Sequence, residues 1–519
     1  MEATDTMNTA NKLRAPLLAM ATLLAALLLG TAPARAEWLR AESPHFVVYS
    51  EAGEQRLREQ VGELEDFHQL LRQLTGTRDE GETAKLSIYI VSGTGELRQV
   101  WSGGSGGIAG FYAASPEGIL AVVDAAAGRG WVGRTEILFH EYAHHFMLQH
   151  FPAVYPRWYA EGFAEYVATA RLEPEVIEYG RMNAALASWV GDASRWIPLD
   201  QLLFMAPDRV ERSAGQYYAQ SWLLVHYLLR DAERMRGLSR YLTAVGAGQD
   251  ARAAFSAAFG MTPSEMQRRL RSYATETMSF TRIRRASASR APELAVTALP
   301  RGAGGLLLLD AAMTADMQLD SEAVVRQARR AAGDAPDAFA RRVVARAEAL
   351  HGDGAAAERL LGELIAASPR DAELHYLMGM RHLRAGRAEE ANRARHFRAA
   401  QSWFVRAHRL DENHYPTLYR YAESLSADPA ALLSDNTTNI LLLAQQLAPQ
   451  ADTIRLSTAN LLMRRERWQE AEALLAPMVS QPHGGATTRR AVALLAKARA
   501  RDRSSLPAVF AGPTEDEGD

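Results

Sequence analysis

The spacing of hydrophobic positions along this chain changes from mixed to almost wholly helical. Up to about residue 130, short extended runs of apolar residues alternate with one long stretch, 55–74, whose apolar residues recur at helical spacing. The strand-like runs are 45–49, 86–91, 108–113 and 119–123. The later helical runs are 158–170, 216–230, 238–245 and 263–273. A small sheet followed by helices predicts an α+β fold for residues 37–278.

A second helical region, 336–503, consists of Ala- and Leu-rich helices that occur in pairs. A small residue, Gly379, lies within a first helix, the pattern W-x-E-A enters a second helix at 468–471, and Pro369 and Pro416 follow helix ends. These features resemble tetratricopeptide repeats, and that resemblance implies a surface for a protein partner. Because the period is imperfect, a generic helical bundle is the alternative interpretation.

Two further segments lack a regular pattern. Residues 279–335 contain a basic run, glycines and a strand-like stretch at 294–299, and we interpret them as a connector. Residues 504–519 end in an acidic, hydrophilic sequence that is typical of a disordered tail.

The first 36 residues have the order of a secretory signal. Lys12 and Arg14 precede an apolar run, 15–29, and Ala34-Arg35-Ala36 follows it. The run is shorter than a comfortable membrane span, so we expect cleavage after Ala36 and a periplasmic or secreted protein without a stable membrane span. An uncleaved N-terminal membrane anchor is the alternative.

Composition narrows the chemistry. The chain has 519 residues, 48% of them hydrophobic, which is enough for two or three domains with proper cores. A net charge of -3 gives no basic surface that would suggest a nucleic-acid partner. Because there is no cysteine, disulfides, thiolate metal ligands and thiol catalysis are excluded, and any metal must be held by histidines and carboxylates.

The most specific local signal is H-E-x-x-H at 140–144, in a segment that should be helical. Two histidines four residues apart lie on the same helix face, so His140 and His144 can bind one zinc ion while Glu141 faces the same spot. A catalytic zinc usually takes three protein ligands and leaves one position open. The pattern therefore predicts Zn2+ as cofactor and requires a third ligand elsewhere.

A second motif supplies candidates for that ligand. The segment 158–166 reads W-Y-A-E-G-F-A-E-Y and begins shortly after the first motif. On a helix, Glu161 and Glu165 share a face one turn apart, an arrangement that a dication and an imidazole would make more favourable. One carboxylate could bind zinc while the other accepts the N–H of a ligand histidine.

Together the two motifs resemble the gluzincin metallopeptidases, and in particular the peptidase-MA-like proteins. The resemblance implies a thermolysin-like metallopeptidase domain over 37–278, with Glu161 as the third zinc ligand and Glu165 as a carboxylate behind the ligands. The segment 216–228 is similar to the helix that carries the transition-state tyrosine in zinc aminopeptidases, which implies that role for Tyr218. The Gly-x-Met-Glu-Asn motif of aminopeptidases is absent, so that specificity is not implied.

These residues predict an exported zinc metallopeptidase in which Glu141 is the general base and Tyr218 helps to stabilise the oxyanion. His226 is a minor oxyanion candidate, and His145 is expected to be structural because it lies about 100° around the helix from His144. The main alternative is a periplasmic interaction scaffold whose repeats carry the function and whose metal domain is inactive or structural. Another zinc-dependent hydrolysis, for example of cell-wall peptides, is a third possibility.

Overall fold

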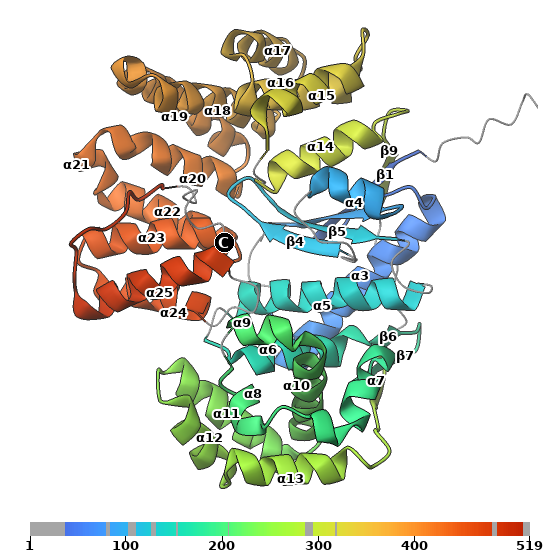
Figure 1. Ribbon diagram of the computed structural model, residues 1–519. Coiled ribbons are helices and arrows are strands. Elements are labelled where there is room, and N and C mark those ends of the chain that lie inside the picture. Colours follow the sequence, from blue (N-terminus) through green and yellow to red (C-terminus); the bar gives the residue numbers. More distant parts are fainter. Residues whose placement is uncertain are drawn as a thin grey trace, which may run out of the picture. The chain divides into compact units, whose positions relative to one another are not determined.

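A six-stranded mixed sheet forms the centre of the N-terminal region. The computed structural model describes residues 37–78, 84–101, 110–125, 131–151, 154–205, 207–285, 294–316, 319–479 and 485–511. The strand order is β4-β5-β3-β2-β1-β9, with a parallel centre and antiparallel pairs at both edges (Figure 1). The strands are β1 Leu39–Glu42, β2 Phe46–Ser50, β3 Leu86–Val91, β4 Gly110–Ala114, β5 Ile119–Asp124 and β9 Ala295–Ala298.

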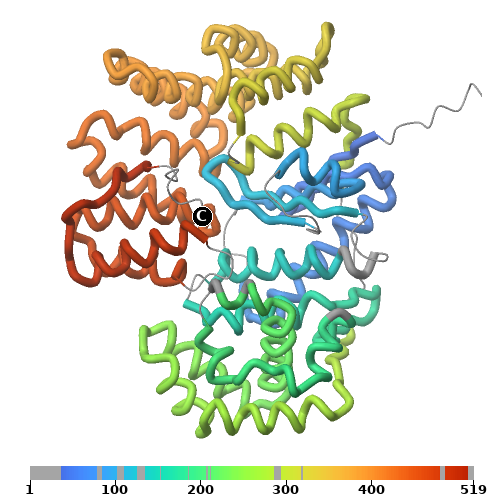
Figure 2. Tube along the Cα trace, in the orientation of Figure 1, coloured from blue at the N-terminus to red at the C-terminus, as the bar shows by residue number. Residues whose placement is uncertain are grey.

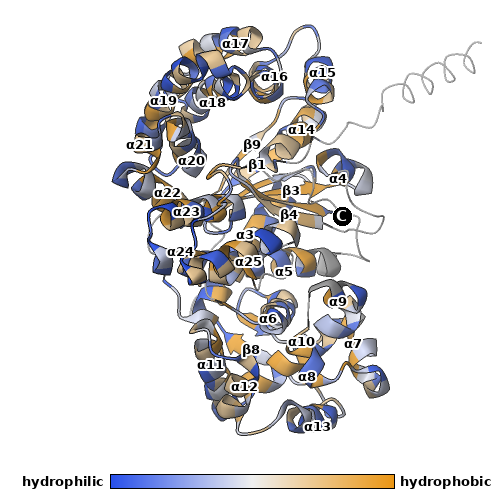
Figure 3. Cartoon of the chain, turned by 60° about the vertical axis from the view of Figure 1, so that its left-hand side comes forward, coloured by the Kyte–Doolittle hydropathy of each residue, from blue (hydrophilic) through white to orange (hydrophobic). Residues whose placement is uncertain are grey.

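Burial explains why this sheet lies inside the protein. All six residues of β5 and five of the six in β3 are buried, as expected for central strands covered on both faces. The predicted hairpin is present, since β4 and β5 pair antiparallel with Ala114 opposite Ile119. Figure 3 shows the strands in hydrophobic colours between the helices that cover them.

Two layers of helices cover the sheet. On one face lie α3, Glu54–Thr75, and α5, Trp131–His150, which share one apolar core with the strands. Phe67 of α3 stacks on Phe139 of α5 with ring centroids 3.9 Å apart. On the other face, α4, Thr94–Val100, and α14, Gly304–Thr314, form a second cluster (Figure 1). The helix that carries H-E-x-x-H is therefore held by the sheet on one side.

A mainly helical lobe follows α5, which agrees with the predicted order of a sheet and then helices. Its helices are α6 Arg157–Ala168, α7 Ala184–Gly191, α8 Leu199–Leu202, α9 Pro207–Arg212, α10 Ala214–Leu229, α11 Ala232–Gly246, α12 Ala251–Phe259 and α13 Pro263–Tyr273. A small antiparallel sheet of β6 Arg171–Leu172, β7 Val176–Tyr179 and β8 Thr281–Arg284 lies beside them. The mixed sheet and these helices give an α+β region.

The segment interpreted as a connector, 279–335, has more structure than its sequence suggests. It contains β8, β9, α14 and α15, Ser321–Ala332. β9 pairs antiparallel with β1 and completes the large sheet, and it lies within the strand predicted at 294–299. α14 was not predicted because its four consecutive leucines, Leu306–Leu309, are all buried, so its apolar residues do not repeat at a helical period.

The C-terminal region is made of antiparallel helix pairs that stack along the chain (Figure 2). The pairs are α16 Ala338–His351 with α17 Gly354–Ala367, α18 Ala372–Ala388 with α19 Arg393–Leu410, α20 Tyr415–Ser424 with α22 Asp435–Leu447, and α23 Asp452–Arg464 with α24 Trp468–Val479. The short α21, Pro429–Leu432, interrupts the third pair, and α25, Gly485–Ala500, packs on α24.

Local sequence explains how these pairs begin and where they cross. Aspartates cap the starts of α16, α17 and α18 by accepting backbone N–H groups. At Gly379 an added Cβ would lie 2.5 Å from the ring of Phe404, so only a residue without a side chain lets α18 and α19 approach this closely. The small residue noted in the sequence therefore marks a helix crossing.

The first residues of the predicted disordered tail, 504–511, pack against the helix pairs. In residues 504–511, Val509 is buried, and Asn460 of α23 donates to the carbonyl oxygen of Pro507 at 2.9 Å. Residues 512–519 and the predicted signal, 1–36, lie outside the described residues. Within the described part of the chain, no helix is both long enough and apolar enough to cross a membrane.

Candidate metal centre

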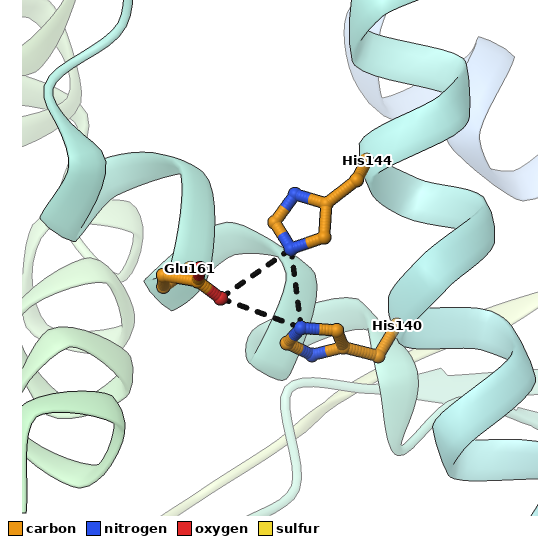
Figure 4. A group of neighbouring side chains, drawn as sticks. All are labelled: His140, His144 and Glu161. Carbon is orange, nitrogen blue, oxygen red and sulfur yellow. Dashed lines mark hydrogen bonds and ion pairs between the residues drawn. The ribbon is translucent and has the colours of Figure 1, made fainter. Parts of the chain in front are cut away.

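Three side chains from two helices converge at one point. His140 and His144 are one turn apart on α5, and Glu161 reaches them from α6 (Figure 4). The Nε2 atoms of the two histidines are 3.1 Å apart. Glu161 Oε2 lies 3.4 Å from His140 Nε2 and 3.3 Å from His144 Nε2. The structure thus brings together the three residues that the sequence predicts as metal ligands.

The geometry of this cluster suits a zinc ion. A tetrahedral ion with bonds of about 2.0–2.1 Å holds its ligand atoms about 3.3 Å from one another. The three distances between the ligand atoms are close to that value, and two nitrogens with one oxygen form a donor set that leaves a fourth position open. Within the described ranges, no other group of three histidines or carboxylates comes together in this way.

Glu165 lies behind the cluster, next to one of the histidines. Its Oε1 is 3.4 Å from Nδ1 of His140, on the side of the ring that faces away from Glu161. A proton on Nδ1 is attracted by this carboxylate, and Nε2 is then left with a lone pair for a metal. Burial raises the pKa of Glu165, as does the charge of Glu161, while His140 opposes the rise.

The protonation of the cluster without a metal follows from its buried charges. Burial alone would lower the pKa of His140, but the hydrogen bond and charge of Glu161 raise it to about 9. Burial would likewise raise the pKa of Glu161, yet His144 and His140 hold it well below its ordinary value. In the metal-free protein the carboxylate is therefore ionised next to a bound proton, which a divalent cation would displace.

The packing of α6 explains how Glu161 reaches α5. Trp158 and Ala164 are fully buried, and they anchor α6 in the core on either side of Glu161. Gly162 faces α10 so closely that a Cβ would lie 2.4 Å from the carbonyl oxygen of Ser221. The glycine of the E-G-x-A motif thus permits a tight α6–α10 contact, which brings α10 up to the metal cluster.

Two more predicted residues lie around the cluster. Glu141 is half-buried. Burial lowers the pKa of His140, but the hydrogen bond and charge of Glu161 raise it, and the charges of Glu165 and Glu141 raise it further. On α10, the ring centroid of Tyr218 is 6.4 Å from that of His140. Burial raises the pKa of Tyr218, and the charges of Glu161 and Glu141 raise it further, so its hydroxyl keeps its proton and can donate a hydrogen bond.

His226 does not belong to this site. It is fully buried, its Nε2 lies 2.8 Å from the carbonyl oxygen of Ser279, and its Nδ1 lies 2.8 Å from the hydroxyl of Tyr273. Both ring nitrogens are therefore occupied inside the helical lobe, and burial lowers the pKa of His226 to about 4. The interpretation of His226 as a minor oxyanion candidate was wrong, because axial spacing on a helix does not show which way a side chain points.

His145 is structural, and its partners could not be predicted from the sequence. It is 5% exposed, and its Nδ1 lies 3.0 Å from the hydroxyl of Tyr112 on β4. Its Nε2 lies 3.3 Å from Nε2 of Gln450, in the loop between α22 and α23. No local motif marks Gln450, since it is 305 residues from His145 along the chain.

A large apolar cavity lies apart from the metal cluster. Its volume is about 760 Å³, and aromatic side chains of α6 and its preceding loop line it together with residues of α11 and α24. The aromatic residues nearest the cluster in sequence are Tyr155, Tyr159, Phe163 and Tyr166. None of the three cluster residues lines this cavity, so the cavity is separate from the candidate metal site.

Comparison with known proteins adds little to this picture. No family model matches the chain, and no curated protein matches it. Among solved structures, a thermophilic tetratricopeptide-repeat protein of Thermus thermophilus is similar, with 20% sequence identity and a TM-score of 0.30. The similarity covers 34% of this chain and 91% of that chain.

Proposed function

We propose that this protein is a zinc-dependent hydrolase of peptide bonds, of the gluzincin type. The observation that carries the proposal is the cluster of His140, His144 and Glu161, whose ligand atoms lie 3.1–3.4 Å apart beside the half-buried Glu141. A structural zinc site is usually closed by four protein ligands, whereas a cluster of three with an adjacent carboxylate is typical of hydrolysis.

The roles of the surrounding residues follow from their positions. Zinc would be held by the three cluster residues, and it would supply Lewis acidity toward a water and a substrate carbonyl. Glu141 accepts the proton of the attacking water and passes it to the leaving amine. The Tyr218 hydroxyl donates a hydrogen bond to the oxygen that becomes negatively charged. Glu165 keeps the His140 ring in the orientation that points Nε2 into the cluster.

The substrate class is a peptide or protein outside the cytoplasm. This part of the proposal rests on the predicted signal, 1–36; the absence of cysteine is compatible with it. Cell-wall peptides belong to the same class, since the same chemistry cleaves them. We further propose that the helix pairs between 336 and 503 provide a surface for a protein partner, as the resemblance to tetratricopeptide repeats implies.

A second candidate is an interaction scaffold with an inactive metal domain. The observation that favours it is the large share of the chain devoted to stacked helix pairs, α16 to α25. The two candidates differ in what Glu141 does, because a scaffold needs no general base.

The deciding experiment is zinc content and peptide cleavage for wild type and Glu141→Gln. We expect one zinc per chain in both proteins, cleavage of casein or of a mixed peptide library by wild type, and a loss of about 10²–10⁴-fold in kcat for the variant. Glu173→Gln, at an exposed residue of the same lobe, is the matched control and should keep full activity. Stoichiometric zinc without any cleavage by wild type would favour the scaffold, and a fully active Glu141→Gln would refute the assigned mechanism.

A further inference from the structure

The helix pairs contact the metal domain through one continuous set of side chains. We call this set the docking face: Arg346, Tyr376, Tyr415, Arg420 and Gln450. The first four lie on α16, α18 and α20, the first helices of successive pairs, and Gln450 lies just before α23. At one end of the face, Arg346 donates to the hydroxyl of Thr314 on α14 at 2.6 Å. The other contacts reach the β4–β5 hairpin and α5, the helix that carries His140 and His144.

The first of these two contacts is made with the hairpin of β4 and β5. Its turn presents Glu117, which accepts hydrogen bonds from the Tyr376 hydroxyl at 2.5 Å and from Arg420 Nε and Nη2 at 3.0 and 2.7 Å. The hydroxyl of Tyr415 donates to the carbonyl oxygen of Ser115 at 3.0 Å. The side chains of Glu117 and Arg420 are only 5% and 11% exposed, and both guanidinium nitrogens donate to Oε1 of Glu117, so this is a buried ion pair rather than a loose surface contact.

The second contact is made with α5. Nε2 of Gln450 lies 3.3 Å from Nε2 of His145, and it also donates a hydrogen bond to Oε1 of Gln149. The opposite ring nitrogen of His145 lies 3.0 Å from the Tyr112 hydroxyl on β4. A repeat residue, the edge strand and the metal helix therefore meet at the residue that directly follows His144.

From these contacts we infer that the helix-pair module positions α5, which carries His140 and His144, relative to the β4–β5 hairpin, with Glu117 and Gln450 as positioning residues. The docking face holds the β4–β5 hairpin at its turn and α5 near its C-terminal end, so it sets the separation between β4 and the helix that carries His140 and His144. Any catalytic consequence rests on the proposed function, but the bracing itself does not. Since the metal domain already occupies this face, a protein partner must bind elsewhere on the helix pairs.

The test uses full-length protein and two variants. Glu117→Gln/Arg420→Met removes both members of the buried ion pair, so neither charge is left uncompensated. Gln450→Ala removes the contact to α5. The control is Arg465→Gln, because among the described residues the side chain of Arg465 bonds to Ser434, Asp435 and Thr438, all within the helix pairs.

The first measurement is amide hydrogen exchange of the metal-free proteins. We expect exchange at least about tenfold faster over 110–118 in the double variant and over 145–150 in Gln450→Ala, with both segments unchanged in the control. Zinc affinity and the separate kcat and KM values are measured next. We expect roughly tenfold weaker zinc binding and a fall of about tenfold in kcat. A small displacement of α5 or of the β4–β5 hairpin would change the positions of the reacting groups.

The outcomes separate the two ideas. Unchanged exchange over both segments in both variants overturns the inference, even if the wild type is an active peptidase. A wild type that binds zinc but cleaves nothing overturns the proposed function, while faster exchange in the variants still supports the bracing. Where Gln450→Ala loosens the whole helix-pair region, Gln450→Glu replaces it, because it keeps the side-chain length but its carboxylate cannot donate to Gln149 Oε1. Faster exchange confined to 145–150 in this variant supports the specific contact, and unchanged exchange there contradicts it.

Discussion

Neighbouring residues on the same helices face either the candidate metal site or the core, and their interaction partners and pKa values differ accordingly. On α5, His140 and His144 meet carboxylates, whereas His145 meets a tyrosine hydroxyl and an amide. Although burial alone would lower it, the pKa of His140 is raised to about 9 by Glu161, while burial lowers the pKa of His145 to about 3. A single step around the helix thus decides whether a histidine is a candidate ligand or a neutral core residue.

The same contrast appears on α10. Tyr217 is 1% exposed and belongs to the core, whereas Tyr218 is only partly buried and lies beside His140. Two turns further along, His226 is again a core residue, held by Ser279 and Tyr273. The residue types of the site therefore recur immediately behind it, and only their surroundings separate function from packing.

The largest expected effect comes from removing the carboxylate of Glu161. Glu161→Ala should abolish stoichiometric zinc binding and all cleavage, because two histidines alone hold the ion too weakly. The measurement is metal content after dialysis, together with activity. Asp200→Ala, at an exposed residue on α8, is the control. Retention of one tightly bound zinc by Glu161→Ala would mean that another residue is the third ligand.

A pair of tyrosine variants tests the contrast on α10. Tyr218→Phe should lower kcat by about 10²-fold without changing zinc content, because it removes one donor to the developing oxyanion. Tyr217→Phe should leave kcat unchanged, since this side chain is buried in the core. Equal kcat values for the two variants would remove Tyr218 from the proposed mechanism.

Glu165 should have a smaller effect than Glu161. Glu165→Ala is expected to weaken zinc binding by about 10–100-fold and to leave a detectable site, because the carboxylate orients His140 without belonging to the ligand cluster. A zinc titration against a competing chelator measures this. If Glu165→Ala lost more affinity than Glu161→Ala, the two assignments would have to be exchanged.

The buried His226 predicts a modest dependence of the free energy of unfolding on pH. His226 has a folded-state pKa of about 4, below its ordinary value near 6.5, so the unfolded chain binds more protons between these values. Stability should therefore fall as the pH drops from about 6.5 to about 4, by on the order of 3 kcal/mol at most from this residue. His226→Gln should flatten that part of the curve in thermal unfolding, and an unchanged slope would contradict the assignment.

Much of the candidate site is readable from the sequence because it is local. Four-residue spacing on a helix is enough to place His140 beside His144, and the same rule places Glu165 beside Glu161. The strands and helices predicted from apolar periodicity up to Tyr273 mostly lie within a few residues of observed elements, whereas β1, α4, α7 and α12 were not predicted. α14 could not be predicted in this way, because its four consecutive leucines, Leu306–Leu309, are all buried and do not repeat at a helical period.

What the sequence determined by itself is the set of local relations: the helical pairs of histidines and glutamates, the hairpin and the paired C-terminal helices. Tertiary structure alone decided that Glu161 meets both histidines and that His226 turns into the core. It also decided that Gln450 joins the helix pairs to α5 and that Glu117 joins them to the β4–β5 hairpin. The physical reason is distance along the chain. A helix repeats every 3.6 residues whatever surrounds it, whereas contacts across about 300 residues depend on how whole elements pack.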